Sequence, residues 1–269
     1  MKTYKRVLSI AGSDPSGGAG IQADIKSISA CGCFATTAIT AVVDENTVGV
    51  FGVHPIPVDF VQGQIKSVLE DIGADAIKIG MLHSSELILA VKKSLTAFQA
   101  KNIVLDPVMV ATSGDALLLP EAISTLKKEL IPMSRIITPN MPEAEMLSGE
   151  KINRLEDMHR VAKLLSLEFG VSVLLKGGHQ HGDTITDIFY NVETHEVFTL
   201  QSCYVNSKNK HGTGCSLSSA LASFLAKGNS LNEAVKAAKS YIDQAITHGA
   251  AYEIGKGNGP IHHFHAYWS

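Results

Sequence analysis

A glycine-rich turn that leads into a helix is the segment of this chain best suited to do chemistry. NKHGTGCSLSSALASFLAKG occupies residues 209–228. Its apolar residues recur with helical spacing, which predicts a helix that begins near residues 213–216. The first backbone N–H groups of a helix lack intrahelical partners and lie at the positive end of its dipole. The turn therefore predicts an anion site formed by Gly212, Thr213, Gly214 and Cys215.

Cys215 has two interpretations at this position. The field of a helix N-terminus lowers the pKa of a cysteine, so the side chain could be a thiolate, or a proton acceptor that faces the bound anion. Free cysteines are also among the most buried residue types, and a small thiol could simply fill a tight helix start. This segment alone leaves both interpretations open.

The composition excludes several classes of protein. The chain has 269 residues, a formal net charge of −3 and no basic run, which argues against nucleic acid or an anionic membrane as the main partner. No segment is apolar for long enough to be a signal sequence or a membrane span. Cys31 and Cys33 have no second ligand pair at zinc spacing, so we expect reduced thiols and a cytoplasmic protein.

Apolar runs typical of strands alternate with helical patterns, and neither a repeat nor a linker interrupts residues 1–269, which we expect to form a single domain. Strands are predicted at 6–10, 74–80, 102–109, 135–140 and 171–178, and helices at 21–30, 85–99, 120–130, 142–149 and 155–169. This α/β pattern predicts a mainly parallel sheet with helices on both faces. Residues 184–191 and 195–205 predict an antiparallel ribbon near one edge, and Ser230 with Glu233 predicts a capping box at the last helix.

The residues just after each apolar run lie at the edge of the predicted sheet where ligands bind in such folds, and they are informative here. They are the segment 11–20, Met81, Asp106, Asn140, Glu143 and Lys176. Each alone has an ordinary explanation, because the end of a strand needs residues that form turns. Their coincidence on one edge, together with the predicted anion site, favours a binding site there.

The same residues have the types that phosphoryl transfer requires. No P-loop motif is present. Lys176 supplies a cation, while Asp106 and Glu143 could organise Mg²⁺. Lys176 could instead be an ordinary solvated lysine, but it ends an apolar strand and precedes two glycines, which favours an ammonium group held at the edge of the sheet.

Two other motifs suggest different ligands. Gly18, Gly20 and Ala23 fit a dinucleotide-binding pattern, but ten residues separate Ile10 from Ile21, too many for the tight turn of that motif. The segment HHFHAYW at 262–268 could bind a metal, but no cysteine or carboxylate is close in sequence. A packed aromatic C-terminus is the favoured interpretation.

Six motifs together resemble one family. They are AGSDPSGGAGIQAD at 11–24, KIGML at 78–82, LDPVM at 105–109, ITPNMPEAE at 137–145, LLKGGH at 174–179 and HGTGCSLSSALA at 211–222. In this order they resemble the hydroxymethylpyrimidine and phosphomethylpyrimidine kinases of thiamine biosynthesis, which are ribokinase-like enzymes. The resemblance implies an αβα sandwich with ATP and substrate at the carboxyl edge of a mainly parallel sheet, and it suggests a homodimer.

The resemblance also implies a role for individual residues. Cys215 would take the hydroxymethyl proton, while the backbone N–H groups of residues 212–215 hold the transferring phosphate. The pyrimidine pocket would contain Gly12, Asp24, Glu45, Met81 and Val108. The region of ATP and Mg²⁺ would contain Asn140, Glu143, Lys176 and Thr213, with Asp106 near the metal. One position departs from the pattern: the family commonly has Gln-Asn-Thr where this chain has Glu45, Asn46 and Thr47.

The leading hypothesis is ATP-dependent phosphorylation of 4-amino-5-hydroxymethyl-2-methylpyrimidine to its monophosphate and then to the diphosphate. Pyridoxal or pyridoxine kinase is a close alternative, because similar cysteine-bearing chains phosphorylate a hydroxymethyl group on a different aromatic ring. An alternative of another class is a nucleotide-binding regulatory protein that kept the fold but has no turnover.

Overall fold

One large sheet organises the chain. The computed structural model describes residues 2–109, 118, 120–177 and 183–268. The order of the strands in the sheet is β10-β9-β8-β7-β6-β5-β1-β2. Their bounds are β1 (Arg6–Ala11), β2 (Phe34–Ile39), β5 (Ala76–Ile79), β6 (Ile103–Leu105), β7 (Ile136–Ile137), β8 (Ser172–Leu175), β9 (Thr184–Asn191) and β10 (Glu196–Cys203). Strands β8, β7, β6, β5, β1 and β2 pair in parallel in that order, whereas β9 and β10 are antiparallel. The predicted parallel sheet and edge ribbon are confirmed.

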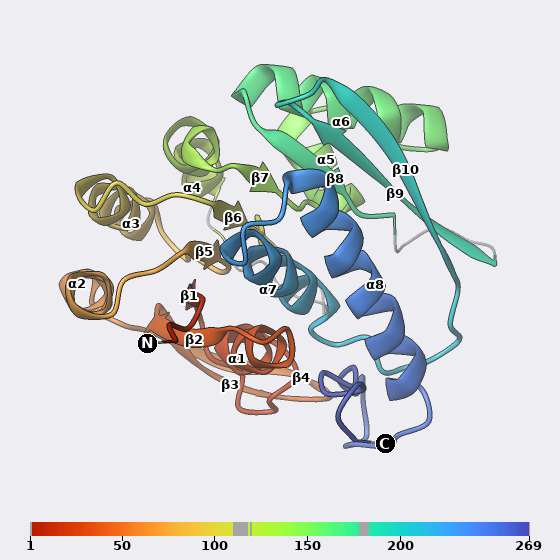
Figure 1. The fold of residues 1–269 in the computed structure, drawn as a ribbon, viewed down its shortest axis with the longest axis horizontal. Helices are drawn as coiled ribbons and strands as arrows, with labels where there is room; N and C mark the ends of the chain where they lie inside the picture. The colour runs from red at the N-terminus through yellow and green to blue at the C-terminus, as the bar shows by residue number, and fades with distance from the viewer. Residues whose placement is uncertain (1, 110–117, 119, 178–182, 269) are drawn as a thin grey trace.

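Helices cover both faces of this sheet (Figure 1). One face packs against α2 (Val58–Asp71), α3 (Ser85–Ala97), α4 (Pro120–Thr125), α5 (Met141–Ser148) and α6 (Leu155–Phe169). The other packs against α1 (Gly20–Ala30), α7 (Thr213–Ala226) and α8 (Leu231–Gly249). Each face has its own cluster of buried apolar side chains, so the predicted αβα sandwich is confirmed.

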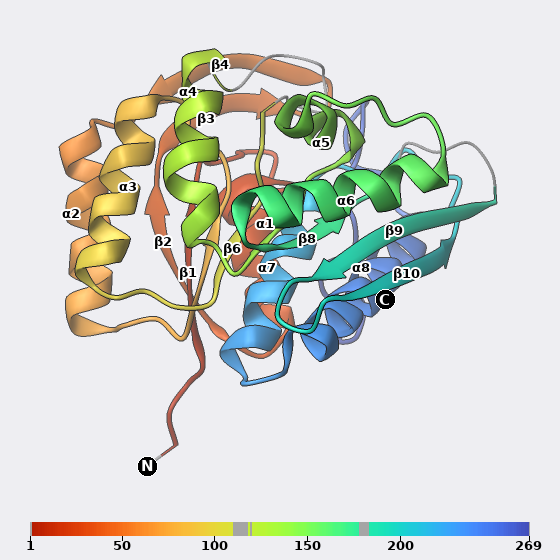
Figure 2. The same ribbon diagram turned by 90° about the horizontal axis from the view of Figure 1, so that it is seen from above.

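The chain between residues 34 and 71 contains elements that the sequence patterns did not predict. These are β2, α2 and an antiparallel hairpin of β3 (Ala41–Asn46) and β4 (Gly49–Pro55), which forms a sheet of its own. The hairpin is joined to the end of β1, because Thr40 N–H donates to the carbonyl of Ala11 at 3.0 Å and Ser13 N–H donates to that of Ala41 at 2.9 Å. Figure 2 shows the hairpin at the edge of the sheet where β1 and β2 end.

Two predictions for the C-terminal part are confirmed. Ser230 and Glu233 form the capping box of α8, with Ser230 N–H donating to the Glu233 carboxylate at 2.9 Å. The histidine-rich end is packed: His262 is buried, and its ring centroid lies 4.2 Å from that of Trp268.

The predicted helix at 120–130 is α4 followed by a π-helical turn, η1 (Leu126–Leu130), and a 3₁₀ turn, η2 (Ile131–Met133). In the described part of the chain no helix is both long and apolar enough to cross a membrane.

Candidate active site

The turn before α7 has the geometry of an anion site. Gly212 is the N-cap of α7 with φ of +79°, a left-handed conformation that favours glycine. A Cβ atom there would lie 1.7 Å from the carbonyl oxygen of Gly18. Among the described backbone hydrogen bonds, the N–H groups of Gly212, Gly214 and Cys215 donate none, whereas Ser216 N–H donates to the carbonyl of Gly212 at 2.9 Å. The free N–H groups therefore point out of the helix start, where a phosphate can accept them.

A lysine–aspartate pair lies beside this turn. Lys176 follows β8 directly, and its Nζ is 3.0 Å from Asp106 Oδ1. A Cβ atom on Gly214 would be 3.4 Å from both Asp106 Oδ2 and Lys176 Nζ. Burial acts to lower the pKa of Lys176, but the charges of Asp106 and Glu143 outweigh burial and raise it. Lys176 is thus a fixed cation at the edge of the sheet, as its position in the sequence predicted.

Asp106 offers one free carboxylate oxygen to this space. Its Oδ1 accepts from Thr138 Oγ1 at 2.9 Å and from Lys176. No described residue donates a hydrogen bond to Oδ2, which faces Gly214. Mg²⁺ is commonly held by one or two carboxylates and substrate phosphates. The free oxygen of Asp106, beside a turn with unpaired N–H groups, therefore fits a magnesium ion.

Glu143 lies near this pair but also caps a helix. Its Oε2 accepts the N–H of Asn140 at 2.8 Å, and its own N–H donates to Asn140 Oδ1 at 2.8 Å. Burial and the charge of Asp106 raise the pKa of Glu143 to about 7, although Lys176 opposes them. A cation bound nearby would favour its ionised form. Asn140 is bridged to Lys176, so the ends of β7 and β8 bring the three predicted residues together.

Cys215 is only partly exposed, and its charge state differs from the one that its position suggested. Burial raises the pKa of the thiol to about 11; the charge of Lys78 lowers it, while Asp24 and Asp106 add to the rise. Of the two interpretations of Cys215, the raised pKa favours a neutral thiol over a thiolate stabilised by the helix N-terminus. The physical reason is that desolvation of the ionised sulfur outweighs the favourable field of the helix.

Asp24 does not line an open pocket, contrary to the expectation from the resemblance. Its side chain and that of Lys78 are both 0% exposed, and Lys78 Nζ is 2.8 Å from each of its carboxylate oxygens. Ser9 and Ser219 donate to the same carboxylate at 2.6 and 2.7 Å. Both oxygens of Asp24 are thus taken, and no atom of the side chain is accessible to a ligand. Lys78 was missed, although a lysine between Ile77 and Ile79 in an apolar strand is an unusual signal.

The other residues of the expected pyrimidine pocket surround the ends of β1 and β5. Gly12 is buried, and a Cβ atom on it would lie 2.8 Å from Cε of Met81. Thr40 Oγ1 donates to the carbonyl of Met81 at 2.9 Å, which fixes that loop to the start of the hairpin. Val108 is partly exposed and lies two residues beyond Asp106, to whose carbonyl its N–H donates at 2.8 Å. Gly12 and Met81 are therefore in direct contact after β1 and β5. Val108 lies after β6, next to Asp106.

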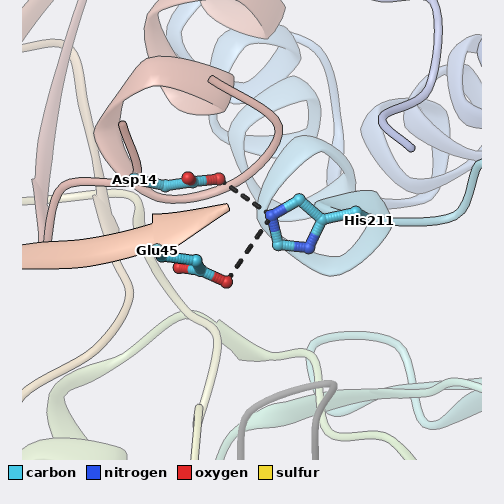
Figure 3. Close-up of side chains that lie close together, drawn as sticks. All are labelled: Asp14, Glu45 and His211. Atoms are coloured by element: carbon cyan, nitrogen blue, oxygen red, sulfur yellow. Dashed lines mark hydrogen bonds and ion pairs between the residues drawn. The ribbon is translucent and has the colours of Figure 1, made fainter. Parts of the chain in front are cut away.

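Glu45 faces two residues that the sequence analysis did not single out (Figure 3). Its Oε1 is 3.8 Å from Nε2 of His211, which is itself 2.8 Å from Oδ2 of Asp14. Asn46, not Glu45, caps the hairpin turn, because its Oδ1 accepts the N–H of Val48 at 2.8 Å. Glu45 does not cap the turn, and its side chain points toward His211 and Asp14. Asp14 and His211 lie within the quoted motifs, and their pairing was not visible because 197 positions separate them.

Comparisons with known proteins identify the family of this chain. A family model described as phosphomethylpyrimidine kinase matches residues 14–262. A hydroxymethylpyrimidine/phosphomethylpyrimidine kinase of Rhizobium meliloti is 46% identical over 262 residues, which cover 97% of each chain. Solved structures provide two further matches. A phosphomethylpyrimidine kinase of Clostridium difficile 630 is 44% identical with a TM-score of 0.79, over 90% of this chain and 99% of that one. A pyridoxal kinase of Staphylococcus aureus, in complex with AMP-PCP and pyridoxal, is 34% identical with a TM-score of 0.90, over 99% and 96%.

These matches extend over nearly the whole length of the chain and of its relatives. The sheet order and the helices on both faces are those of a ribokinase-like fold, which is also the fold of the structural neighbours. The pyridoxal kinases match the fold at least as well but are less similar in sequence than the pyrimidine kinases. The chain therefore belongs to the phosphomethylpyrimidine kinase family.

Proposed function

We propose that residues 1–269 form one domain that transfers the γ-phosphoryl group of ATP to the hydroxymethyl group of 4-amino-5-hydroxymethyl-2-methylpyrimidine, and then phosphorylates the monophosphate. The observation that best supports this is the meeting of Lys176, Asp106 and Gly214 at one point. A fixed cation, a free carboxylate oxygen and unpaired backbone N–H groups are the parts that phosphoryl transfer needs. Relatives across nearly the full length carry the name of this activity.

In the proposed mechanism the N–H groups of residues 212–215 hold the transferring phosphate while Lys176 stabilises its charge. Asp106, with Glu143 close by, would hold Mg²⁺, which supplies charge neutralisation for the phosphates when bound. Asn140 and Thr213 would border the nucleotide, Asn140 through the cap of α5 and Thr213 at the first position of α7. Each of these protein groups is fixed before substrate arrives, which keeps the cost of reorganisation low.

Cys215 is the proposed acceptor of the hydroxymethyl proton. Its thiol is neutral near pH 7, since burial raises the thiol pKa to about 11. The charge of Lys78 favours ionisation, whereas Asp24 and Asp106 oppose it. A bound cation that offsets Asp106 therefore favours the basic form of Cys215. The thiolate would accept the hydroxymethyl proton as that oxygen bonds to the γ-phosphorus. The bond from this phosphorus to the bridging oxygen of ADP breaks, ADP leaves, and the free N–H groups beside the sulfur would hold the phosphate in line.

Glu45 is the residue that we propose to select the ring. Its carboxyl is 18% exposed and receives no hydrogen bond from a described residue. An aminopyrimidine offers an exocyclic amine as a donor, together with a ring nitrogen that can share a proton. Pyridoxal presents oxygen acceptors around its ring, and acceptors that faced Glu45 would be mispaired. This mismatch costs on the order of 1–3 kcal/mol in a desolvated site, which favours the pyrimidine.

Pyridoxal kinase is a second candidate, favoured by the structural similarity to the Staphylococcus aureus enzyme. ATP consumption with the aminopyrimidine alcohol, with pyridoxal and with no acceptor separates the candidates. We expect ADP to form fastest with the pyrimidine, and product masses should reveal the mono- and diphosphate. Turnover with pyridoxal alone would favour the second candidate, and binding of ATP without acceptor-dependent turnover would favour a regulatory protein.

We also propose that two copies associate, as the resemblance suggests. The hairpin and the neighbouring α2 expose the apolar side chains of Val42, Val48, Phe51, Val53 and Phe60. Exposed apolar surface of this kind is typical of protein contacts. Sedimentation velocity of the wild type and of Phe51→Ser would test this, since a monomeric wild type is incompatible with the proposal. A cytoplasmic location stays a prediction.

A further inference from the structure

His211 joins two parts of the proposed site. It directly precedes Gly212 of the anion turn, while its ring lies between two carboxyl groups (Figure 3). One belongs to Asp14, in the loop between β1 and α1, and the other to Glu45 of β3. A Cβ atom on Gly18 would lie 2.4 Å from Cδ2 of the ring. The imidazole is therefore packed closely against this loop and has little room to change its orientation.

The two carboxyl groups have different roles toward the imidazole. Asp14 accepts the N–H groups of Ser16, Gly18 and Ala19 at 2.7, 3.1 and 2.6 Å, and it accepts from His211 Nε2 at 2.8 Å. It is thus a fixed anchor for the ring. The 3.8 Å separation between Nε2 and Glu45 is too long for a hydrogen bond. Glu45 feels the charge of the imidazole but keeps both of its oxygens available for a ligand.

Charged groups of both signs surround Glu45. His211 and Asp14 face it directly. Burial acts to lower the pKa of His211, but the hydrogen bond and charge of Asp14 and the charge of Glu45 raise it above the usual value, which favours the protonated ring. Lys26 of α1 lies near Asp14, with Nζ 2.7 Å from the carbonyl of Gly17. His263 faces His211 from the C-terminal segment, and it is neutral because burial lowers its pKa to about 3.

The pKa of Glu45 itself is raised by burial and by the charge of Asp14, while His211 opposes this rise. The two neighbours thus act on Glu45 in opposite directions. Removal of the imidazolium leaves Glu45 beside an uncompensated anion, so Glu45 holds its proton to higher pH. While the imidazole stays protonated, removal of the Asp14 charge has the reverse effect. Both signs follow from the arrangement of three side chains and do not depend on any ligand.

We propose that His211, anchored by Asp14, is a positioning residue that controls how Glu45 shares one proton with the ring nitrogen of the aminopyrimidine substrate. This inference rests on the proposed function. The second carboxyl oxygen would accept from the exocyclic amine. The proton is on Glu45 or on the ring nitrogen, and if both begin unprotonated, binding takes one proton from water. Above the pH at which this proton is lost, two acceptors face each other and binding weakens.

The first test is the pH dependence of KM for the aminopyrimidine alcohol. We expect KM to rise about tenfold as the shared proton is lost, the scale of one mispaired polar contact. His211→Gln should move this rise to higher pH, and Asp14→Asn should move it to lower pH. KM for ATP should show neither shift. In the Glu45→Gln background, His211→Gln should not change the pH at which KM rises, because no titratable carboxyl remains at that position.

The second test needs no substrate. Glutamate labelled with ¹³C at the side-chain carboxyl allows the titration of Glu45 to be followed by NMR, with Glu45→Gln to assign its signal. We expect an upward shift of its midpoint in His211→Gln and a downward shift in Asp14→Asn. If circular dichroism shows that one variant is unfolded, the other variant must still shift the Glu45 midpoint in the direction predicted for it. Unchanged midpoints, or shifts of the opposite sign, overturn the inference, whereas a protein that shows these shifts but does not phosphorylate the pyrimidine refutes only the proposed function.

Discussion

Two lysine–aspartate pairs lie close to the start of α7, and their surroundings differ. Lys78 and Asp24 are both 0% exposed, and both oxygens of Asp24 accept hydrogen bonds within the protein. Lys176 and Asp106 are 16% and 3% exposed, and no described residue donates to Asp106 Oδ2. The first pair is closed to ligands, whereas the second faces the anion turn with unused bonding capacity.

The difference in burial indicates that the inner pair, Lys78 and Asp24, has a structural role, and that the outer pair, Lys176 and Asp106, has a role in the reaction. Desolvation of two charges is costly, and the inner pair recovers that cost only through its complete set of hydrogen bonds. Ser219 connects the pair to α7 one turn after Cys215, so the pair fixes the helix whose start forms the anion turn. The outer pair is fixed through Asp106 Oδ1, while Asp106 Oδ2 and the unpaired N–H groups of the turn stay available for a metal ion and a phosphate. The inner pair should therefore control stability, and the outer pair turnover.

The largest expected effect is on the thiol that lies between the two pairs. Cys215→Ala should lower kcat by about 10²- to 10⁴-fold, the scale for loss of a general base. Binding of ATP, measured by calorimetry, should stay nearly unchanged because the backbone of the turn is kept. Cys215→Ser is the matched control for packing. Turnover of the alanine variant close to that of the wild type would make Cys215 a packing residue.

The inner pair gives the largest expected effect on folding. Lys78→Met leaves the carboxylate of Asp24 buried without its cation and should cost about 3–5 kcal/mol of unfolding free energy in urea denaturation. The double variant Lys78→Met with Asp24→Leu removes both charges and should recover most of that loss. A single variant as stable as the wild type would show that the pair does not hold α1, β5 and α7 together.

Ring selection should respond on a smaller scale. In the wild type we expect kcat/KM to favour the aminopyrimidine over pyridoxal by about tenfold or more, the equivalent of one mispaired contact. Glu45→Gln should narrow this preference, or weaken binding of the pyrimidine while it remains a substrate. Steady-state kinetics with both acceptors provides the measurement. The same preference in both proteins is the result that contradicts a role for Glu45.

The smallest expected effect is on the pH dependence of stability. The pKa of His211 is raised in the folded protein. The contribution of the protonated ring to the unfolding free energy is therefore complete below the unfolded pKa of about 6.5, and it is lost as the pH rises through the folded pKa. The pKa of Asp14 lies below its usual value, because hydrogen bonds from His211, Ser16 and Ala19 outweigh burial. Its contribution is present above about pH 4 and is lost as the pH falls through the lowered value.

The pair is thus most stabilising between about pH 4 and 6.5. Between pH 6 and pH 9 the wild type should lose on the order of 1 kcal/mol more unfolding free energy than His211→Gln. Urea titrations at both pH values, with circular dichroism as the signal, would measure this. Parallel losses in the two proteins would exclude a charged His211.

Most of the sheet and the outer pair could be predicted from the sequence because their signals are local. A lysine at the end of an apolar strand and glycines before a helical pattern indicate Lys176 and Gly212 without any knowledge of the fold. The hairpin was missed for the opposite reason. The residues of β4 are mostly exposed, so the sequence shows no alternation of apolar and polar residues there. The strand forms because it pairs with β3.

The inner pair and the charge state of Cys215 could not be predicted, because both depend on burial by distant segments. Lys78 and Asp24 are 54 positions apart, and Ser219 is 195 positions from Asp24. The helix dipole at Cys215 is a local feature and predicts a low pKa, but desolvation by the surrounding fold reverses the sign. The resemblance placed Asp24 in the pyrimidine pocket. Its contacts with Lys78, Ser9 and Ser219 show that it is a buried residue of the protein interior.

The central claim is that Lys176 stabilises the phosphoryl group as it moves from ATP to the pyrimidine alcohol. The direct measurement is single-turnover transfer of a radiolabelled γ-phosphate to that alcohol by the wild type and by Lys176→Met, with the melting temperature of each protein recorded. We predict labelled pyrimidine monophosphate from the wild type, and a rate lower by about 10²- to 10³-fold in the folded variant at saturating ATP and Mg²⁺. Equal transfer rates in the two proteins, or no label on the alcohol with the wild type, would contradict the account.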